Sequence, residues 1–197
     1  MRAAALLVAA AVIAVGVGDL LLAPSDPTAP SFLSKLPTDA LRTPVLQRHE
    51  RGTAGGAIPA GTTVFDYDVP GVAKLDPALL GALRDAATEA AGEGIELQVD
   101  SGWRSPAYQE RLLAEAVQKY GSEAEAARWV ATPTTSAHVS GDAVDIGPAD
   151  AAAWLAERGA AYGLCPIYAN EPWHYELRSG GCPPMYADPT HDPRMHR

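Results

Sequence analysis

Basic residues are scarce in this sequence. Its 197 residues include 15 lysines and arginines against 24 aspartates and glutamates, which gives a net charge of −9 at pH 7. Proteins that bind nucleic acid need a basic surface to neutralise phosphates. The composition therefore argues against a nucleic-acid-binding protein, and we expect no nucleic acid among its partners. The acidic balance otherwise favours solubility and identifies no substrate.

A long uninterrupted apolar segment is also missing. Arg2 precedes an apolar run from Ala3 to Val17, and Asp19 interrupts the run before residues 20–23. A positive residue before an apolar stretch is typical of an export signal, although no clean A-x-A cleavage site follows. Because the run is rich in alanine, it is weakly hydrophobic for a stable membrane span. We expect residues 1–23 to be an export signal or membrane anchor, which places the protein outside the cytoplasmic membrane. A buried alanine-rich helix is the disfavoured alternative.

Cysteine is nearly absent. Cys165 and Cys182 are the only two, and neither lies in a C-x-x-C motif. An even number of cysteines in an exported chain predicts a disulfide, which here would close a short loop containing Glu171 and His174. Two buried free thiols are the alternative. Zinc ligation by these cysteines is disfavoured because the sequence contains a better set of ligands.

Proline and glycine divide the rest of the chain into segments. Residues 24–60 contain many of both and show little periodicity, so we expect a linker. Residues 61–182 carry strand and helix patterns, with order beginning near Thr62. Residues 183–197 are rich in proline, and we expect an irregular tail. No internal repeat is present, and the length suits one compact domain with tails.

Within residues 61–182, short strand-like stretches are mixed with longer stretches that have helical spacing. Strands are predicted at residues 62–69, 95–102, 143–147 and 172–178. Helices are predicted at residues 77–92, 106–120, 122–131 and 148–163. Asp76 before Pro77 forms a typical helix start, and Ser122 and Glu125 have the spacing of a capping box. This mixed order predicts an α+β fold with a small sheet flanked by helices.

Two histidines and one aspartate form a candidate metal-binding set. His138 and Asp145 lie seven residues apart in the segment SAHVSGDAVD, and Gly141 permits a tight turn between them. His174 ends the segment EPWH. Two imidazoles and one carboxylate suit a catalytic zinc site because the fourth coordination position stays open for water.

Glu171 and Arg104 are candidate catalytic residues beside this set. Pro172 biases Glu171 towards an extended backbone, so Glu171 could face a zinc-activated water, take its proton and return it to the leaving amine. Glu176 is a rival base because it shares a strand face with His174. Arg104, in the loop SGWRS, could bind a terminal carboxylate or an oxyanion, or could simply pair with a surface acid.

These segments resemble a known family. SAHVSGDAVD and EPWH are similar to the paired motifs SxHxxGxAxD and ExWH of the zinc D-Ala-D-Ala metallopeptidases, which include VanY-type D,D-carboxypeptidases and VanX-type D,D-dipeptidases. SGWRS resembles the family loop SGYRS, with Trp103 replacing tyrosine, and Gln109 follows at the family spacing. The resemblance covers roughly Phe65 to Leu177. It makes residues 61–182 a peptidase domain.

The resemblance also implies a fold and a set of roles. The fold would be the small α+β fold, with an antiparallel sheet flanked by helices, of the Hedgehog amino-terminal domain. The resemblance implies that the Zn²⁺ ligands are His138, Asp145 and His174, and that the catalytic base is Glu171. It implies that Arg104 is the substrate or transition-state arginine, and that Ser136 and Gln109 lie near the bound peptide.

Within this family, the sequence favours the VanY type. VanX-like enzymes are typically cytoplasmic and carry E-W-W-H, whereas this chain has E-P-W-H and an export signal. The implied activity is removal of the terminal D-Ala from peptidoglycan stem peptides ending in D-Ala-D-Ala, in glycopeptide resistance or in wall maintenance. The alternatives are a D,D-dipeptidase, a peptidoglycan endopeptidase, or a non-catalytic zinc-containing wall-binding module, which would not need Glu171. The sequence does not indicate an oligomeric state.

Overall fold

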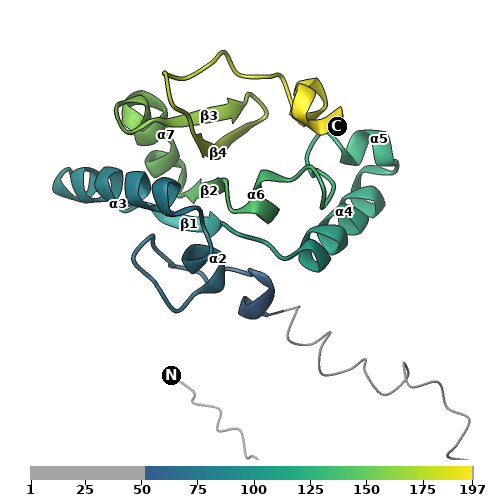
Figure 1. The fold of residues 1–197 in the computed structure, drawn as a ribbon, viewed down its shortest axis with the longest axis horizontal. Helices are drawn as coiled ribbons and strands as arrows, with labels where there is room; N and C mark the ends of the chain where they lie inside the picture. The colour runs from purple at the N-terminus through teal and green to yellow at the C-terminus, as the bar shows by residue number, and fades with distance from the viewer. Residues whose placement is uncertain (1–51, 197) are drawn as a thin grey trace, which may run out of the picture. The chain divides into compact units, whose positions relative to one another are not determined.

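The computed structural model describes residues 52–196 (Figure 1). The predicted export segment, residues 1–23, and all but the end of the predicted linker lie outside the described residues. Within residues 52–196, no helix combines the length and the hydrophobicity needed to cross a membrane.

A four-stranded antiparallel sheet lies at the centre of the fold, with strand order β1-β2-β4-β3. Its strands are β1 (Gln98–Ser101), β2 (Ala143–Gly147), β3 (Leu164–Tyr168) and β4 (Glu171–Leu177). Three of the predicted strands are confirmed as β1, β2 and β4. Strand β3 has no predicted counterpart, because its sequence LCPIY is short, lacks polar alternation and directly follows a helical pattern. The α+β class with a small antiparallel sheet is confirmed.

Two helices, α3 (Pro77–Gly92) and α7 (Ala149–Arg158), pack against one face of this sheet (Figure 1). The Asp76 side chain accepts hydrogen bonds from two backbone N–H groups at the start of α3, as its predicted capping role requires. Gly163, with φ of 74°, ends the short 3₁₀ turn that follows α7. Both helix predictions are confirmed over most of their length.

The apolar faces of α3 and α7 form one core with the strands. The buried members include Leu79 and Leu83 of α3, Leu155 of α7, and Val144, Ile146 and Tyr175 of the sheet. Each fully buried aliphatic side chain contributes about 1.5–3 kcal/mol relative to exposure. Because side chains alternate along a strand, Asp145 and His174 point to the opposite face of the sheet.

That opposite face is bordered by α4 (Pro106–Tyr120), α5 (Glu123–Ala126) and the single turn α6 (Ala137–Ser140). Helix α4 begins and ends at the predicted residues. Helix α5 is shorter than the predicted helix 122–131. After Ala126 the chain continues as a turn, in which the backbone N–H groups of Trp129 and Val130 both donate to the carbonyl oxygen of Ala126.

The predicted strand at residues 62–69 is wrong. Only Thr63 makes a β-bridge, with Gln98, and the rest of the segment forms turns. The Asp66 carboxylate accepts hydrogen bonds from both the backbone N–H and the hydroxyl of Thr63, which stabilises a turn instead of a strand. Regular structure is also present before Thr62, as a 3₁₀ turn at Thr53–Gly55. The next element is α2 (Pro70–Ala73).

The C-terminal tail packs onto the domain. A disulfide joins Cys165 on β3 to Cys182 at the start of the tail. Beyond it, the tail contains two 3₁₀ turns, Pro189–His191 and Pro193–His196, without helix or strand. Asp188 and Asp192 are nevertheless buried. Figure 1 shows these turns (yellow) beside the sheet.

Loss of the disulfide should destabilise the folded protein. The bridge spans 17 residues, and closing a loop of this length is worth about 3 kcal/mol in the unfolded-chain model. We expect a Cys165→Ala/Cys182→Ala double variant to lose about this much free energy of unfolding in urea titrations. Reducing agent should weaken the unmodified protein to the same extent and leave the variant unchanged. Equal stability of the two proteins would contradict this expectation.

Candidate metal centre

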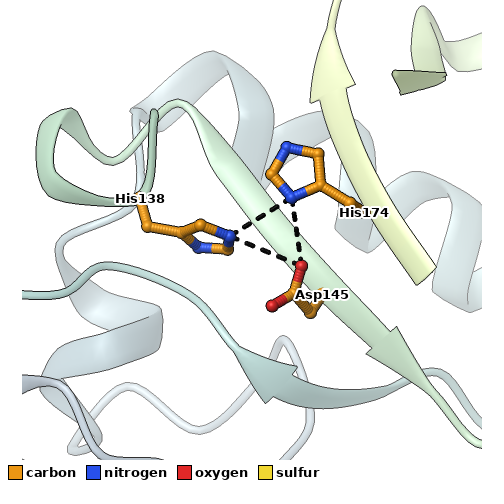
Figure 2. A group of neighbouring side chains, drawn as sticks. All are labelled: His138, Asp145 and His174. Carbon is orange, nitrogen blue, oxygen red and sulfur yellow. Dashed lines mark hydrogen bonds and ion pairs between the residues drawn. The ribbon is translucent and has the colours of Figure 1, made fainter. Parts of the chain in front are cut away.

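Three buried side chains from separate elements converge on one point (Figure 2). His138 comes from α6, Asp145 from β2 and His174 from β4. His174 Nδ1 lies 3.2 Å from His138 Nε2 and 3.1 Å from Asp145 Oδ1. His138 Nε2 lies 3.4 Å from the same Asp145 oxygen. The structure thus brings together the three predicted ligands, with their donor atoms within 4.8 Å of one another.

The backbone fixes this convergence. Asp145 and His174 are direct partners across the antiparallel pair β2–β4. Gly141 ends α6 with φ of 85°, so the chain can leave His138 and turn immediately into β2. A Cβ atom on Gly141 would lie 2.6 Å from the carbonyl oxygen of Lys74, so the close packing at this turn also requires glycine.

Each of the two histidine rings also has a partner on the side that faces away from the centre. His138 Nδ1 lies 2.9 Å from the backbone oxygen of Gly102, and His174 Nε2 lies 3.4 Å from Glu176 Oε1. Each of these nitrogens faces an acceptor and can donate to it, and a metal at the centre would then take the lone pair of the other nitrogen of each ring. Metal-binding histidines are typically held in this way.

The electrostatics of the centre favour a cation. Asp145 is buried, which opposes ionisation, but His138, His174 and Arg104 keep the pKa of its carboxyl well below the usual range. Burial also acts against charge on His174, yet hydrogen bonds to Asp145 and Glu176 raise the pKa of its imidazole to about 9. Burial lowers the pKa of His138, which favours the neutral ring that binds metals.

Glu171 lies beside the three converging residues, but its carboxylate is not among the donor groups that converge. Its Oε2 atom is 3.9 Å from His174 Nδ1, and its buried Oε1 atom has no hydrogen-bond partner among the described residues. Burial raises the pKa of this carboxyl to about 7. A carboxyl with a free oxygen and a pKa near neutrality suits proton transfer.

Glu176, the rival base, is occupied elsewhere. Arg178 and Arg194 both donate to its carboxylate, and its other neighbour is His174. Although burial opposes ionisation, the hydrogen bonds from His174 and Arg194 lower its pKa to about 2. The geometry therefore favours Glu171 over Glu176 as a proton acceptor.

Arg104 makes contacts that the sequence does not reveal. It donates to Ser101 Oγ at 2.8 Å, Gln109 Oε1 at 3.1 Å and Asp145 Oδ2 at 3.0 Å. Its ion-pair partner is thus a buried acid of the candidate metal set, not a surface acid. Gln109 is buried and also donates to the backbone oxygen of Ala131, so its amide is engaged on both sides.

A pocket of about 370 Å³ opens onto the centre. Arg104, Gln109, Ser136 and Glu171 line it together with the three converging residues. Tyr120 and Trp129, whose stacked rings have centroids 5.7 Å apart, also line it. Trp173 is a further lining residue, with 40% of its surface exposed. These aromatic residues have no place in the predicted site. Only the position of Trp173 inside EPWH could have indicated its location.

Comparisons with known proteins agree with this geometry. The sequence profile of the family described as "VanY: D-alanyl-D-alanine carboxypeptidase" matches residues 72–179. A D-alanyl-D-alanine carboxypeptidase from Enterococcus faecalis is 31% identical over 127 residues, which cover 52% of this chain and 47% of the relative. The chain therefore spans about half the length of this curated relative.

Two solved structures are similar to the chain. One is a variant of the vancomycin-resistance D,D-pentapeptidase VanY from a VanB-type cassette in complex with Zn(II), with a TM-score of 0.50 and 30% identity, covering 52% of this chain and 72% of that one. The other is VanYB in complex with D-alanine-D-alanine, with a TM-score of 0.51 and 29% identity, covering 53% and 72%.

Proposed function

Because the chain belongs to the VanY family of D-alanyl-D-alanine carboxypeptidases, we propose that it is a zinc-dependent D,D-carboxypeptidase acting on peptidoglycan stem peptides. The observation that carries this proposal is the convergence of His138, Asp145 and His174 beside the free carboxyl oxygen of Glu171. The products would be free D-alanine and a stem peptide one residue shorter.

The three converging residues fit Zn²⁺. They offer two nitrogen donors and one oxygen donor, which is a common set for catalytic zinc. When bound, zinc would lower the pKa of a coordinated water to about 7 and polarise the scissile carbonyl. Zn(II) in the VanY complex supports this choice of metal.

Glu171 would carry the proton in the reaction. Burial raises the pKa of its carboxyl, which favours uptake of a proton from the attacking water and its later donation to the amine of the leaving D-alanine. Its position in the same pocket as the three ligands supports this role. A wall-binding module without activity would have no use for such a group.

Arg104 would bind the substrate while it also contacts Asp145, one of the proposed metal ligands. Three of the five guanidinium N–H groups donate to Ser101, Gln109 and Asp145, which leaves two for a substrate carboxylate or developing oxyanion. Ser136 lines the same pocket and could contact the peptide. Gln109 would act mainly by holding Arg104.

Replacing Arg104 with lysine should impair catalysis. Lys retains the positive charge but loses the planar fork that contacts three partners. We expect kcat/KM for release of D-alanine from a stem pentapeptide to fall about 10-fold to 100-fold, as loss of a charged hydrogen bond of about 1.5–3 kcal/mol would give. Arg111→Lys is the matched control, because Arg111 pairs with the exposed Glu115. Unchanged kinetics of Arg104→Lys would exclude the substrate role.

Product analysis tests the reaction itself. The purified protein would be given the pentapeptide, the dipeptide D-Ala-D-Ala and a crosslinked muropeptide, each with and without a chelator. A carboxypeptidase releases one D-alanine from the pentapeptide, and a chelator should stop this release. Cleavage of the dipeptide alone would instead identify a D,D-dipeptidase, and cleavage of crosslinks an endopeptidase. No product from any substrate would refute the proposal.

We also propose that the protein acts outside the cytoplasm. The disulfide between Cys165 and Cys182 supports this location, since such bonds persist in oxidising compartments. There, removal of terminal D-alanine would destroy the D-Ala-D-Ala target of glycopeptide antibiotics or trim the wall during maintenance. Antibiotic susceptibility with and without the active protein would separate these two roles.

A further inference from the structure

The C-terminal tail has no role in the proposed reaction, yet it contacts Glu176, which lies on the side of His174 that faces away from the metal centre. Glu176 lies on β4 two residues after His174, with 1% of its surface exposed. Its Oε1 atom faces His174 Nε2, the ring nitrogen that points away from the centre, at 3.4 Å. Glu176 is therefore the hydrogen-bond acceptor for the outer nitrogen of the His174 ring, and its orientation affects the orientation of the ring.

Arg194, in the last 3₁₀ turn of the tail, holds both oxygens of Glu176. Its Nη1 atom donates to Oε2 at 2.7 Å, and its Nη2 atom donates to Oε1 at 3.1 Å. Arg178 also contacts the carboxylate, but only at Oε2. Arg194 is thus the described cation that holds the oxygen facing His174.

Two attachments of the tail to β3 place Arg194 close to Glu176. Cys165, to which Cys182 is bridged, is the direct cross-strand partner of Glu176. From there the tail follows β3, where the N–H of Tyr186 donates to the carbonyl oxygen of Ile167. The chain then passes through the 3₁₀ turn at Pro189–His191 to Arg194, whose side chain reaches Glu176 on β4.

Two acids of the tail fix its last turns. The fully buried Asp192 accepts from Arg194 Nη2 at 2.6 Å and from the hydroxyl of Tyr168. The ring of Tyr168 in turn packs 5.1 Å from that of His174. Asp188 anchors the preceding turn to Arg128 near α5. The guanidinium of Arg194 is therefore held from both sides.

We propose that Arg194, acting through Glu176, is a positioning residue for the metal ligand His174. A carboxylate that accepts from the outer nitrogen of a ligating histidine fixes its tautomer and its ring orientation. Arg194 fixes the carboxylate in turn, because its planar fork engages both oxygens. The inference rests on the proposed zinc site, and it makes the C-terminal segment part of that site.

The test is the zinc affinity of purified variants, measured by competition with a chromogenic chelator. Loss of an outer partner of a metal ligand typically weakens binding about 10-fold to 100-fold. Because Arg194 holds that partner, Glu176, and does not contact the ring itself, we expect Arg194→Ala to weaken zinc binding by up to about 10-fold. Arg194→Lys, which keeps the charge without the fork, should recover part of the affinity. The absorption spectrum of the Co²⁺-substituted protein should also change in Arg194→Ala, because the ring of His174 is less well fixed.

Two matched controls separate positioning from general stability. Arg178→Ala removes a cation from Glu176 Oε2 only, and Arg128→Ala removes an anchor of the tail that does not touch Glu176. Arg128→Ala should lower the melting temperature without changing zinc affinity, and Arg178→Ala should weaken zinc less than Arg194→Ala does. If Arg194→Ala fails to fold, Glu176→Gln, which keeps the shape of the side chain, replaces it in the comparison.

The outcomes are distinct. Zinc affinity of Arg194→Ala equal to that of the unmodified protein would overturn the positioning role and leave the proposed function standing. Equal losses in Arg194→Ala and Arg128→Ala would also overturn it, because they would show that docking of the tail alone matters. An unmodified protein that takes up no zinc would overturn the proposed function and this inference together.

Discussion

Glu171→Gln is expected to reduce kcat about 10²-fold to 10⁴-fold while zinc remains bound. Glutamine has nearly the same shape as glutamate but cannot accept and return a proton at neutral pH. Because the Glu171 carboxyl lies beside the three converging residues and is not one of them, its replacement should leave the metal site intact. Release of D-alanine and the zinc content of the purified protein are the two measurements.

Glu115→Gln is the matched control for this variant. Glu115 lines the same pocket but is exposed on α4, where it pairs with Arg111. Its replacement removes one acid from the pocket without touching the metal centre, and we expect near-normal turnover. A Glu171→Gln protein with near-normal turnover would assign the base elsewhere, whereas loss of zinc from it would make Glu171 a ligand.

His174→Ala is expected to abolish both zinc binding and hydrolysis. The side chain supplies one of three donor atoms, so its loss should weaken zinc by more than the roughly 100-fold that removal of an outer partner can cost. It would also leave the buried carboxylates of Asp145 and Glu176 without a common partner. Metal analysis after dialysis and D-alanine release would measure the two losses.

His191→Ala controls for the removal of a histidine as such. His191 lies in the tail, is exposed, and contacts Asp188 rather than the metal centre. Zinc content and turnover should stay at the level of the unmodified protein. Should His174→Ala retain a full equivalent of tightly bound zinc, the ligand set proposed for this protein would have to be replaced.

His138 and Asp145 can be predicted as neighbours from local chain geometry, whereas His174, which meets Asp145 across 29 positions, is identified by the resemblance of EPWH to a family motif. Gly141 turns the chain between His138 and Asp145, and this turn is visible as a glycine inside a short motif. The helices beginning after Asp76 and Ser105 are equally visible, because each starts with a capping side chain and a proline. Such features depend on neighbours in sequence.

Other parts of the site depend on contacts between distant residues. Arg104 meets Asp145 across 41 positions, and Arg194 meets Glu176 across 18. The loop SGWRS marks Arg104 as a candidate substrate arginine but does not reveal its contact with Asp145, and no local pattern distinguishes Arg194 from an arginine that pairs with a surface acid. The strand prediction at residues 62–69 is wrong for a local reason. The alternation of this segment is typical of a strand, but the hydrogen bonds that Thr63 donates to the Asp66 carboxylate favour a turn.

The direct pairing of Asp145 with His174 ties activity to correct folding. In an antiparallel ladder, a slip of one position reverses the faces of all following side chains. Such a slip would expose the apolar Val144 or Tyr175 at the same moment that it separated the aspartate from the histidine. A misaligned chain would thus be a poor catalyst and a poorly stable protein at once. Selection for either property would maintain the other.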